Sequence, residues 1–298
     1  MRKIRRQRVG YVTLAVCLFA GVSLVAQRFR ATIDTVQVSV TVTDANGRLV
    51  TGLSKDDFEI FEDAVAQPVT VFTDERVPIS LGVLLDSSDS MRGQRIADAR
   101  VAVDRFVSML LESEDEAFVA TFNHAPHLVG QWTRPPAVLS GVLDELFPSG
   151  GTALYDALVA SASYFGRRTH ARAALVVISD GVDTASDVTL RQASDIVRRF
   201  EPLVYAIAID SPGATASTRV NPDALREITA TNGGYTEVVR DSVDLGPATE
   251  RIANELNKQY TLGYVPSRPP DGGWRAIRVR VRHQNYFTRA RRGYFSRQ

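Results

Sequence analysis

Cysteine is almost absent from this chain, since Cys17 is the only one among 298 residues. The rest of the chain therefore forms no internal disulfide and carries no thiol for redox or zinc–thiolate chemistry. Motifs of common enzymes are missing too: there is no G-x-S-x-G, no H-E-x-x-H, no G-x-x-x-x-G-K and no G-x-G-x-x-G after a strand. Tandem repeats and low-complexity tracts are also lacking. These absences favour a binding module over an enzyme.

A large excess of charge of one sign is also lacking. The formal net charge is +1. Residues 1–26 hold five of the 35 basic residues and none of the 34 acidic ones, so the remainder carries a net charge of about −4. Proteins that bind nucleic acid present strongly basic surfaces, and this balance disfavours such a partner.

The first 26 residues have the pattern of an export signal. A basic stretch through Arg8 precedes an apolar run from Val9 to Ala26. Ala26 is a candidate cleavage edge, but the run is also about long enough to span a bilayer. A cleaved signal peptide and an uncleaved anchor both stay open, with the basic flank inside either way. Cys17 is interpreted as a small apolar residue of this run, because the preceding Val16 is too bulky for a good lipidation signal.

This segment predicts an exported protein that resides in the periplasm, in the cell envelope or outside the cell. Contact with a membrane is expected only through the N-terminal segment, and only if that segment is not cleaved.

Residues 79–256 alternate apolar strands with helices. Strands are expected at 79–85, 117–122, 173–178 and 203–209, and helices at 96–110, 154–165, 190–200, 222–230 and 243–256. The strands are apolar on both faces, which is typical of a parallel sheet covered by helices on both sides. In such sheets ligands bind at the carboxyl ends of the strands.

The flanking segments, 27–78 and 257–298, have a different pattern. Valines at 36, 38, 40 and 42 alternate with polar residues, which predicts a half-buried strand, and a turn follows at 44–47. Further strands are expected at 58–61, 69–72, 260–264 and 277–281. Neither flank has enough strands to close a core alone. We therefore expect both to build one small antiparallel β-sandwich, with the central domain inserted between them.

Polar residues follow the central strands at three places. Asp86, Ser88 and Ser90 form a D-x-S-x-S sequence after the strand at 79–85, Thr152 opens a helix, and Asp180 follows the strand at 173–178. Hydroxyl and carboxylate oxygens suit Mg²⁺, Mn²⁺ or Ca²⁺ rather than zinc. Because hydroxyl ligands are neutral, an ion held there stays under-neutralised and favours an additional carboxylate from outside.

These residues, in this order, resemble the metal-ion-dependent adhesion site (MIDAS) of the von Willebrand factor type A (VWA) domain. The resemblance covers residues 79–256. The flanks are similar to those of a group of secreted bacterial VWA proteins, with a V-x-V-x-V-x-V-T-D-x-x-G opening from Val36 to Gly47 and an R-x-G-Y sequence that ends at Tyr294. The resemblance to the VWA domain implies an α/β fold with a doubly wound, mostly parallel sheet of the VWA or Rossmann-like kind.

The resemblance also implies a function and a ligand set. Ser88 and Ser90 would bind the metal directly, Asp86 and Asp180 directly or through water, and Thr152 when a ligand arrives. The cofactor would be Mg²⁺, or else Mn²⁺ or Ca²⁺. We expect an exported, metal-binding adhesion module that captures a protein partner through an acidic side chain.

Plainer interpretations stay open for each of these residues. Asp86 and Ser88 are also suited to cap the following helix, with Thr152 and Asp180 as ordinary loop residues. Three further candidates lie beside the site. Asp89 and Asp183 either contribute negative potential or hold water, or else are solvated loop carboxylates. Asp156 either acts behind the ligands or favours the N-terminus of its helix.

Two other functions remain as alternatives. One is an envelope scaffold or assembly factor, with the sandwich as contact surface and the metal site secondary. The other is a metal-dependent hydrolase, which needs a general base or second metal that the sequence does not show.

Two further groups of residues attract notice. His124 and His127 lack a carboxylate or cysteine at zinc spacing and are expected to be a surface pair. A basic face is expected near the C-terminus, either to contact anionic lipid or polysaccharide or, more simply, as a solvated strand face that deters edge pairing. Its members are Arg278, Arg280, Arg282, Arg289, Arg291 and Arg292.

Overall fold

A computed structural model describes residues 35–134, 139, 141, 143–210 and 222–297. The chain divides into two units, Met1–Ile33 and Asp34–Gln298, and the description concerns the second. The predicted signal or anchor at 1–26, with Cys17, lies outside the described residues. Among the helices that the structure describes, none combines the length and apolar character needed to cross a bilayer.

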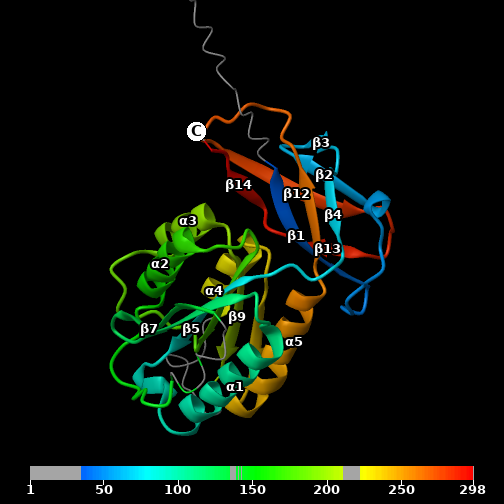
Figure 1. The fold of residues 1–298 in the computed structure, drawn as a ribbon. Helices are drawn as coiled ribbons and strands as arrows, with labels where there is room; N and C mark the ends of the chain where they lie inside the picture. Colours follow the sequence, from blue (N-terminus) through cyan, green and yellow to red (C-terminus); the bar gives the residue numbers. More distant parts are fainter. Residues whose placement is uncertain (1–34, 135–138, 140, 142, 211–221, 298) are drawn as a thin grey trace, which may run out of the picture. The chain divides into compact units, whose positions relative to one another are not determined.

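A six-stranded sheet in the order β10-β9-β8-β5-β6-β7 forms the core of the α/β part (Figure 1). Its strands run parallel except for β7, which is antiparallel to β6. In four of these strands every residue is buried, as the continuous apolar runs predicted. The bounds are β5 Ser80–Asp86, β6 Glu116–Phe122, β7 Pro126–Thr133, β8 Ala173–Ser179, β9 Leu203–Ile209 and β10 Thr236–Val239.

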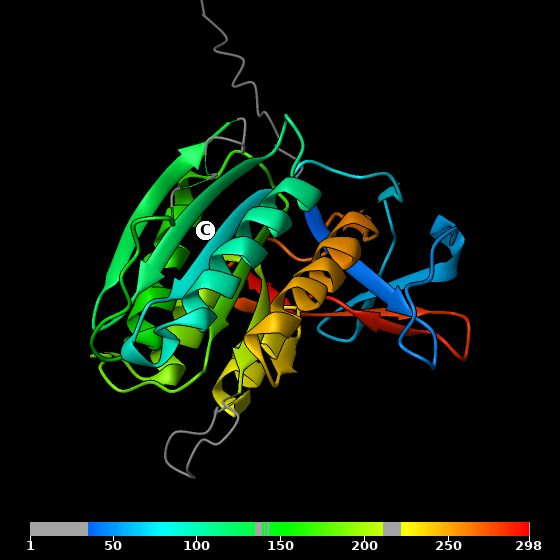
Figure 2. The ribbon, with the colours of Figure 1, turned by 90° about the horizontal axis from the view of Figure 1, so that it is seen from below.

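Helices cover both faces of this sheet. α1 (Gln94–Leu110) and α5 (Leu245–Asn257) lie side by side on one face, as Figure 2 shows, and their apolar side chains pack with those of Leu81, Val83 and Leu85. The opposite face packs against the remaining helices, which are α2 (Leu154–Tyr164), α3 (Leu190–Phe200) and α4 (Pro222–Thr231). The predicted doubly wound α/β fold is confirmed.

Local sequence explains where one helix begins. The Thr189 hydroxyl accepts the Gln192 N–H (3.3 Å), and the Gln192 side-chain carbonyl accepts the Thr189 N–H (2.8 Å). This capping box supplies partners for backbone N–H groups that a helix start otherwise leaves open. α3 therefore has the bounds that the sequence predicted.

The two flanks together form the β-sandwich, as expected. One sheet has the order β13-β1-β11-β4 and the other β14-β12-β2-β3, so each sheet combines strands from both ends of the chain. The strand predicted at 69–72 is found at Val71–Thr73, because pairing with β11 begins only at Thr70, whose N–H donates to the Gly263 carbonyl (2.7 Å). The bounds are β1 Val36–Thr43, β2 Phe58–Glu62, β3 Val65–Gln67, β4 Val71–Thr73, β11 Tyr260–Tyr264, β12 Trp274–Val281, β13 Phe287–Arg289 and β14 Gly293–Phe295.

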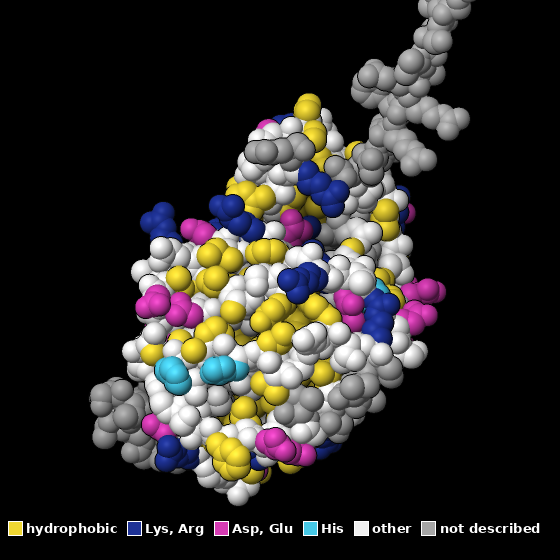
Figure 3. Space-filling view, turned by 60° about the vertical axis from the view of Figure 1, so that its left-hand side comes forward, with side chains coloured by type: hydrophobic (Ala, Val, Ile, Leu, Met, Phe, Trp, Pro, Cys, Tyr) yellow, Lys and Arg dark blue, Asp and Glu magenta, His cyan; other side chains and the backbone are white. Residues whose placement is uncertain are grey.

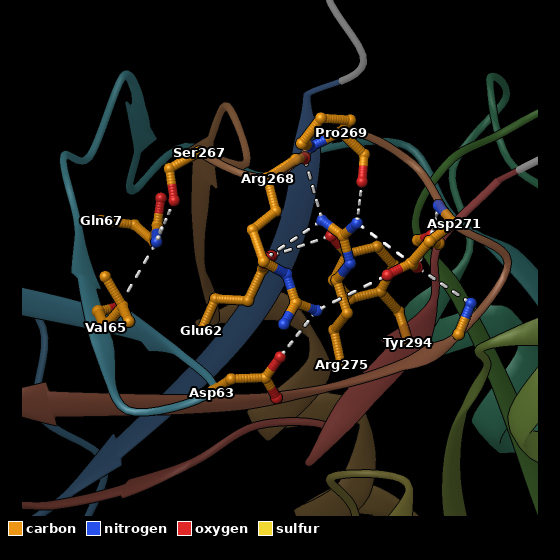
Figure 4. A network of polar contacts seen from close by, with 12 residues as sticks. Glu62, Asp63, Val65, Gln67, Ser267, Arg268, Pro269, Asp271, Arg275 and Tyr294 are labelled. Carbon is orange, nitrogen blue, oxygen red and sulfur yellow. Dashed lines mark hydrogen bonds and ion pairs between the residues drawn. The ribbon is translucent and has the colours of Figure 1, made fainter.

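A buried ion pair lies inside the sandwich (Figure 4). Glu62 on β2 is 3 % exposed and Arg275 on β12 is 1 % exposed, and their side chains are 3.2 Å apart. The other Glu62 oxygen accepts the hydroxyls of Tyr264 and Tyr294, each at 2.8 Å. Burial, reinforced by this bond to Glu62, raises the pKa of Tyr294 to about 12. Arg275 also donates to the carbonyls of Arg268 and Pro269 and to the carboxylate of Asp271.

A second polar cluster joins the sandwich to the α/β part. Glu255 on α5 accepts hydroxyl hydrogen bonds from Thr41 on β1 (3.0 Å) and from Tyr205 on β9 (2.8 Å). Its other oxygen pairs with Arg289 on β13. The two parts therefore share buried hydrogen bonds, and each satisfies polar groups of the other.

Candidate functional site

The candidate site lies where the strand order of the large sheet changes direction. β5 is followed by β6 on one side, whereas the later strand β8 pairs on its other side. In open α/β sheets such a switch point, at the carboxyl ends of the strands, is where ligands bind. Asp86 ends β5, and Asp180 directly follows β8.

Asp86 is fully buried and held by neutral donors. One carboxylate oxygen accepts the Ser88 N–H (2.8 Å) and the other accepts the Ser179 hydroxyl (2.6 Å). Burial raises the pKa of Asp86 to about 6, against the effect of the Ser179 bond and with a smaller contribution from the negative charge of Asp180. Asp86 and Asp180 therefore interact as like charges at a site with little solvent.

The two serine hydroxyls of the D-x-S-x-S sequence lie together. Ser88 Oγ and Ser90 Oγ are 3.0 Å apart, with Ser88 buried and Ser90 exposed. Ser90 precedes Met91 in the short 3-10 helix η2 (Asp89–Met91). The pair thus links the buried carboxylate to the protein surface.

Backbone hydrogen bonds tie the D-x-S-x-S loop to the loop before α2. The Ser149 N–H donates to the Ser87 carbonyl (2.9 Å), and the Asp89 N–H donates to the Gly150 carbonyl (3.0 Å). Gly150 has φ +77°, which favours glycine, and a Cβ there would lie 3.2 Å from His124 Nδ1. A side chain at position 150 would therefore strain the backbone of this loop and crowd His124.

Thr152 ties the same loop to the third one. Its N–H donates to Thr184 Oγ1 (2.9 Å), and its carbonyl accepts the N–H groups of Thr184 (2.8 Å) and Ala185 (3.1 Å). Asp180, 8 % exposed, accepts the Val182 N–H (3.3 Å) in that third loop. The structure therefore connects the three loops that carry the predicted ligands.

The other three aspartates have contacts of their own. Asp89 is 59 % exposed and pairs with Arg92 (2.7 Å). The remaining two hold the loop after Asp180 against α2. Asp156 accepts the N–H groups of Asp187 and Val188. Asp183 accepts the Ser186 hydroxyl and the Tyr155 N–H. Any role of these three behind a metal ion stays a prediction.

Sequence reasoning missed two residues of this edge, Ser179 and Thr184. Ser179 is fully buried and orients Asp86, and it also accepts the Gly181 N–H (3.0 Å). Its signal was a hydroxyl residue at the end of the strand, directly before Asp180. Thr184 lies in a polar loop with no comparable signal, so only the tertiary structure shows that it bonds Thr152.

The donor set fits a hard divalent cation. In the described parts of the chain, neither Asp86 nor Asp180 forms an ion pair with Lys or Arg. A cation would compensate both carboxylates, and the hydroxyls of Ser88 and Ser90 are oxygen donors beside them. Within those same parts there is no group of three or more His, Cys, Asp and Glu suited to a metal. The predicted ligand set differs from such a group, because it has only two carboxylates and takes its other oxygen donors from three hydroxyls.

His124 and His127 lie near this edge as a surface pair. Their rings are 6.5 Å apart and both side chains are exposed. Figure 3 shows the face that lies to the left in Figure 1, where acidic, basic and hydrophobic side chains are interspersed. This view gives no sign of a surface dominated by one charge.

The chain is similar to known VWA domains. A family model, von Willebrand factor type A domain, matches residues 81–182. No curated protein matches the chain.

Solved structures show the same fold at low sequence identity. A von Willebrand factor type A protein from Catenulispora acidiphila has a TM-score of 0.54 and 13% identity, over 88% of this chain and 75% of that chain. An aerotolerance-related membrane protein from Bacteroides fragilis has a TM-score of 0.51 and 20% identity, over 60% and 99%. The vWF domain of a type V pili tip protein from Porphyromonas gingivalis has a TM-score of 0.51 and 16% identity, over 61% and 96%.

Proposed function

We propose that this chain, in which residues 81–182 match the von Willebrand factor type A domain, is an exported binding module that captures a protein partner through a divalent cation. The cation is Mg²⁺ in this proposal, with Mn²⁺ or Ca²⁺ as substitutes. The observation that carries the proposal is the buried Asp86, which has a like charge, Asp180, as its neighbour and only neutral donors as partners. The vWF domain of a type V pili tip protein has a similar fold, which supports an adhesive role.

The residues divide their tasks in this proposal. Ser88 and Ser90 would hold the ion through hydroxyl oxygens, and Asp86 and Asp180 would hold it directly or through water. Thr152 would join when the partner binds. A divalent ion among so many neutral ligands keeps part of its charge and attracts a carboxylate of the partner. Ser179 would keep the Asp86 carboxylate in one orientation, because its hydroxyl occupies one carboxylate oxygen.

Calorimetric titration of the full chain with Mg²⁺ tests this function. We expect Mg²⁺ binding by the native protein and none by Asp86→Ala, with the fold retained by circular dichroism. Asp89→Ala is the matched control, because this neighbouring carboxylate is exposed and paired with Arg92. An unchanged Mg²⁺ affinity in Asp86→Ala contradicts the proposal.

A scaffold or assembly role is the second candidate. Apolar side chains are exposed on and beside short sandwich strands, with Val65 58 %, Phe287 60 % and Val265 39 % exposed. Such side chains suit contact with another protein. Cross-linking in the native cells with and without EDTA separates the two functions: a partner that is retained in EDTA favours the scaffold, and one that is lost favours the metal-dependent module.

A further inference from the structure

A groove in the sandwich gathers five of the six arginines of the basic face. It has a volume of about 590 Å³ and lies between β12 and residues 286–292, with Ala230 and Gly234 completing its lining. That volume is in the range of ligand sites in proteins. No acidic residue lines it, and its arginines are Arg278, Arg280, Arg289, Arg291 and Arg292.

Two of these arginines are already paired within the chain. Arg289 pairs with Glu255, and Arg291 pairs with Glu201. The other three form no ion pair within residues 35–134, 143–210 and 222–297, although Arg280 lies over the ring of Phe61 (5.3 Å). Three positive charges of the groove are therefore left for an anionic ligand.

One side of the groove is formed by β12. β12 pairs with β2 along Ile277–Val281, but β14 pairs with it only over Trp274–Ala276. Beyond that point residues 286–292 lie beside β12 and take up some of its edge groups. The Ile277 N–H donates to the Arg292 carbonyl (2.8 Å), and the Val279 carbonyl accepts the Thr288 hydroxyl (2.7 Å). Arg278 and Arg280 lie two residues apart on this strand, with both side chains exposed.

We propose that this groove binds an acidic segment of a partner protein in extended conformation. An extended chain places alternate side chains on one side, which matches the spacing of Arg278 and Arg280 along β12. Carboxylates at those positions meet guanidinium groups, which bind carboxylates in a planar, two-pronged geometry. The exposed Phe287 adds an apolar contact at the rim of the groove. This site is separate from the metal site and needs no cation.

The test is binding of a short labelled peptide of alternating glutamate and threonine, measured by fluorescence anisotropy on the full chain. Replacing Arg278, Arg280 and Arg292 by serine should weaken binding about tenfold or more. The matched control replaces Arg167, Arg191 and Arg282 by serine, which changes the net charge equally at exposed positions outside the groove. Equal loss in both variants overturns the proposal, because it shows attraction by net charge alone.

Further probes separate the groove from the metal site. The part of the binding that depends on Arg278, Arg280 and Arg292 should be the same in Mg²⁺ and in EDTA, and in Asp86→Ala. A loss in EDTA places the peptide at the metal site and overturns the groove. Binding of sulfated dextran or anionic lipid vesicles by a protein that does not bind the peptide would also overturn the proposal.

Discussion

Glu62 in the sandwich and Asp86 in the α/β sheet are both buried carboxylates, with 3 % and 0 % of their surfaces exposed. Glu62 has a guanidinium and two tyrosine hydroxyls as partners, all supplied by the sandwich. Asp86 has one backbone N–H and one serine hydroxyl, and the nearby charge of Asp180 has the same sign. The sandwich compensates its buried charge internally, whereas the sheet edge does not.

The difference teaches where to look for an external ligand. A buried charge without a counter-charge costs several kcal/mol, so a protein retains one mainly where something else supplies the opposite charge. Glu62 needs nothing from outside and acts as a structural residue. Asp86 lacks such a counter-charge, and this supports the proposed metal site at the switch point of the sheet.

The largest expected effect comes from breaking the compensated pair. Arg275→Met should lower the free energy of unfolding by about 3–5 kcal/mol, because Glu62 stays buried without its counter-charge. Urea denaturation measures the change. Arg282→Met is the control, since its pair with Glu59 is exposed and is expected to contribute about 1 kcal/mol or less. Similar small losses in both variants would mean that Arg275 is not what compensates Glu62.

The uncompensated site should instead respond to the cation. At a Mg²⁺ concentration of about 100 times the dissociation constant, we expect the folded protein to gain about 2.7 kcal/mol relative to EDTA. Asp86→Asn should show no such gain, whereas Asp89→Asn should keep it. Denaturant melts with and without Mg²⁺ measure this. A gain retained in Asp86→Asn would place the cation elsewhere.

A smaller effect is expected from the residue that orients Asp86. Ser179→Ala removes a hydrogen bond to a charged group inside the protein, which contributes about 1.5–3 kcal/mol to stability. Ser179→Thr keeps the hydroxyl and should recover part of the loss. Urea denaturation in EDTA isolates this contribution from that of the metal. No loss of stability in Ser179→Ala would show that Asp86 does not depend on this bond.

The smallest effect concerns the exposed end of the Arg275 network. The Ser296 hydroxyl and then the Gly273 N–H hold the pKa of Asp271 at about 2, below its usual 3.8. A depressed pKa gives stability that is present above pH 3.8 and is lost as the pH falls through about 2. Ser296→Ala should raise this pKa toward 3.8, as followed by NMR titration of the Asp271 carboxyl. An unchanged pKa would assign the shift to other partners.

Much of the fold was predictable because its signals are local. Continuous apolar runs identified β5, β6, β8 and β9, and alternating valines identified β1. The capping pair Thr189 and Gln192 set the start of α3. The order of D-x-S-x-S, Thr152 and Asp180 indicated the VWA domain, which the comparison with its family model confirmed.

Other elements lacked such signals. β7 begins at Pro126, contains Gly130 and departs from regular pairing with β6 near Val119, so its pattern does not stand out from a loop. β10, β13 and β14 are short and take their definition from the strands beside them. Edge strands of this kind depend on pairing with distant residues, which periodicity does not reveal.

The sequence by itself determined that hard oxygen donors follow apolar strands, since both the donors and the strands are properties of a few adjacent residues. Only the tertiary structure decided which charges have partners. Arg275 and Glu62 are far apart in the chain, as are Ser179 and Asp86, and each pair meets because sheet pairing brings its strands together. Whether a buried charge is neutralised depends on distances across the fold, and those distances are set by packing rather than by neighbours in sequence.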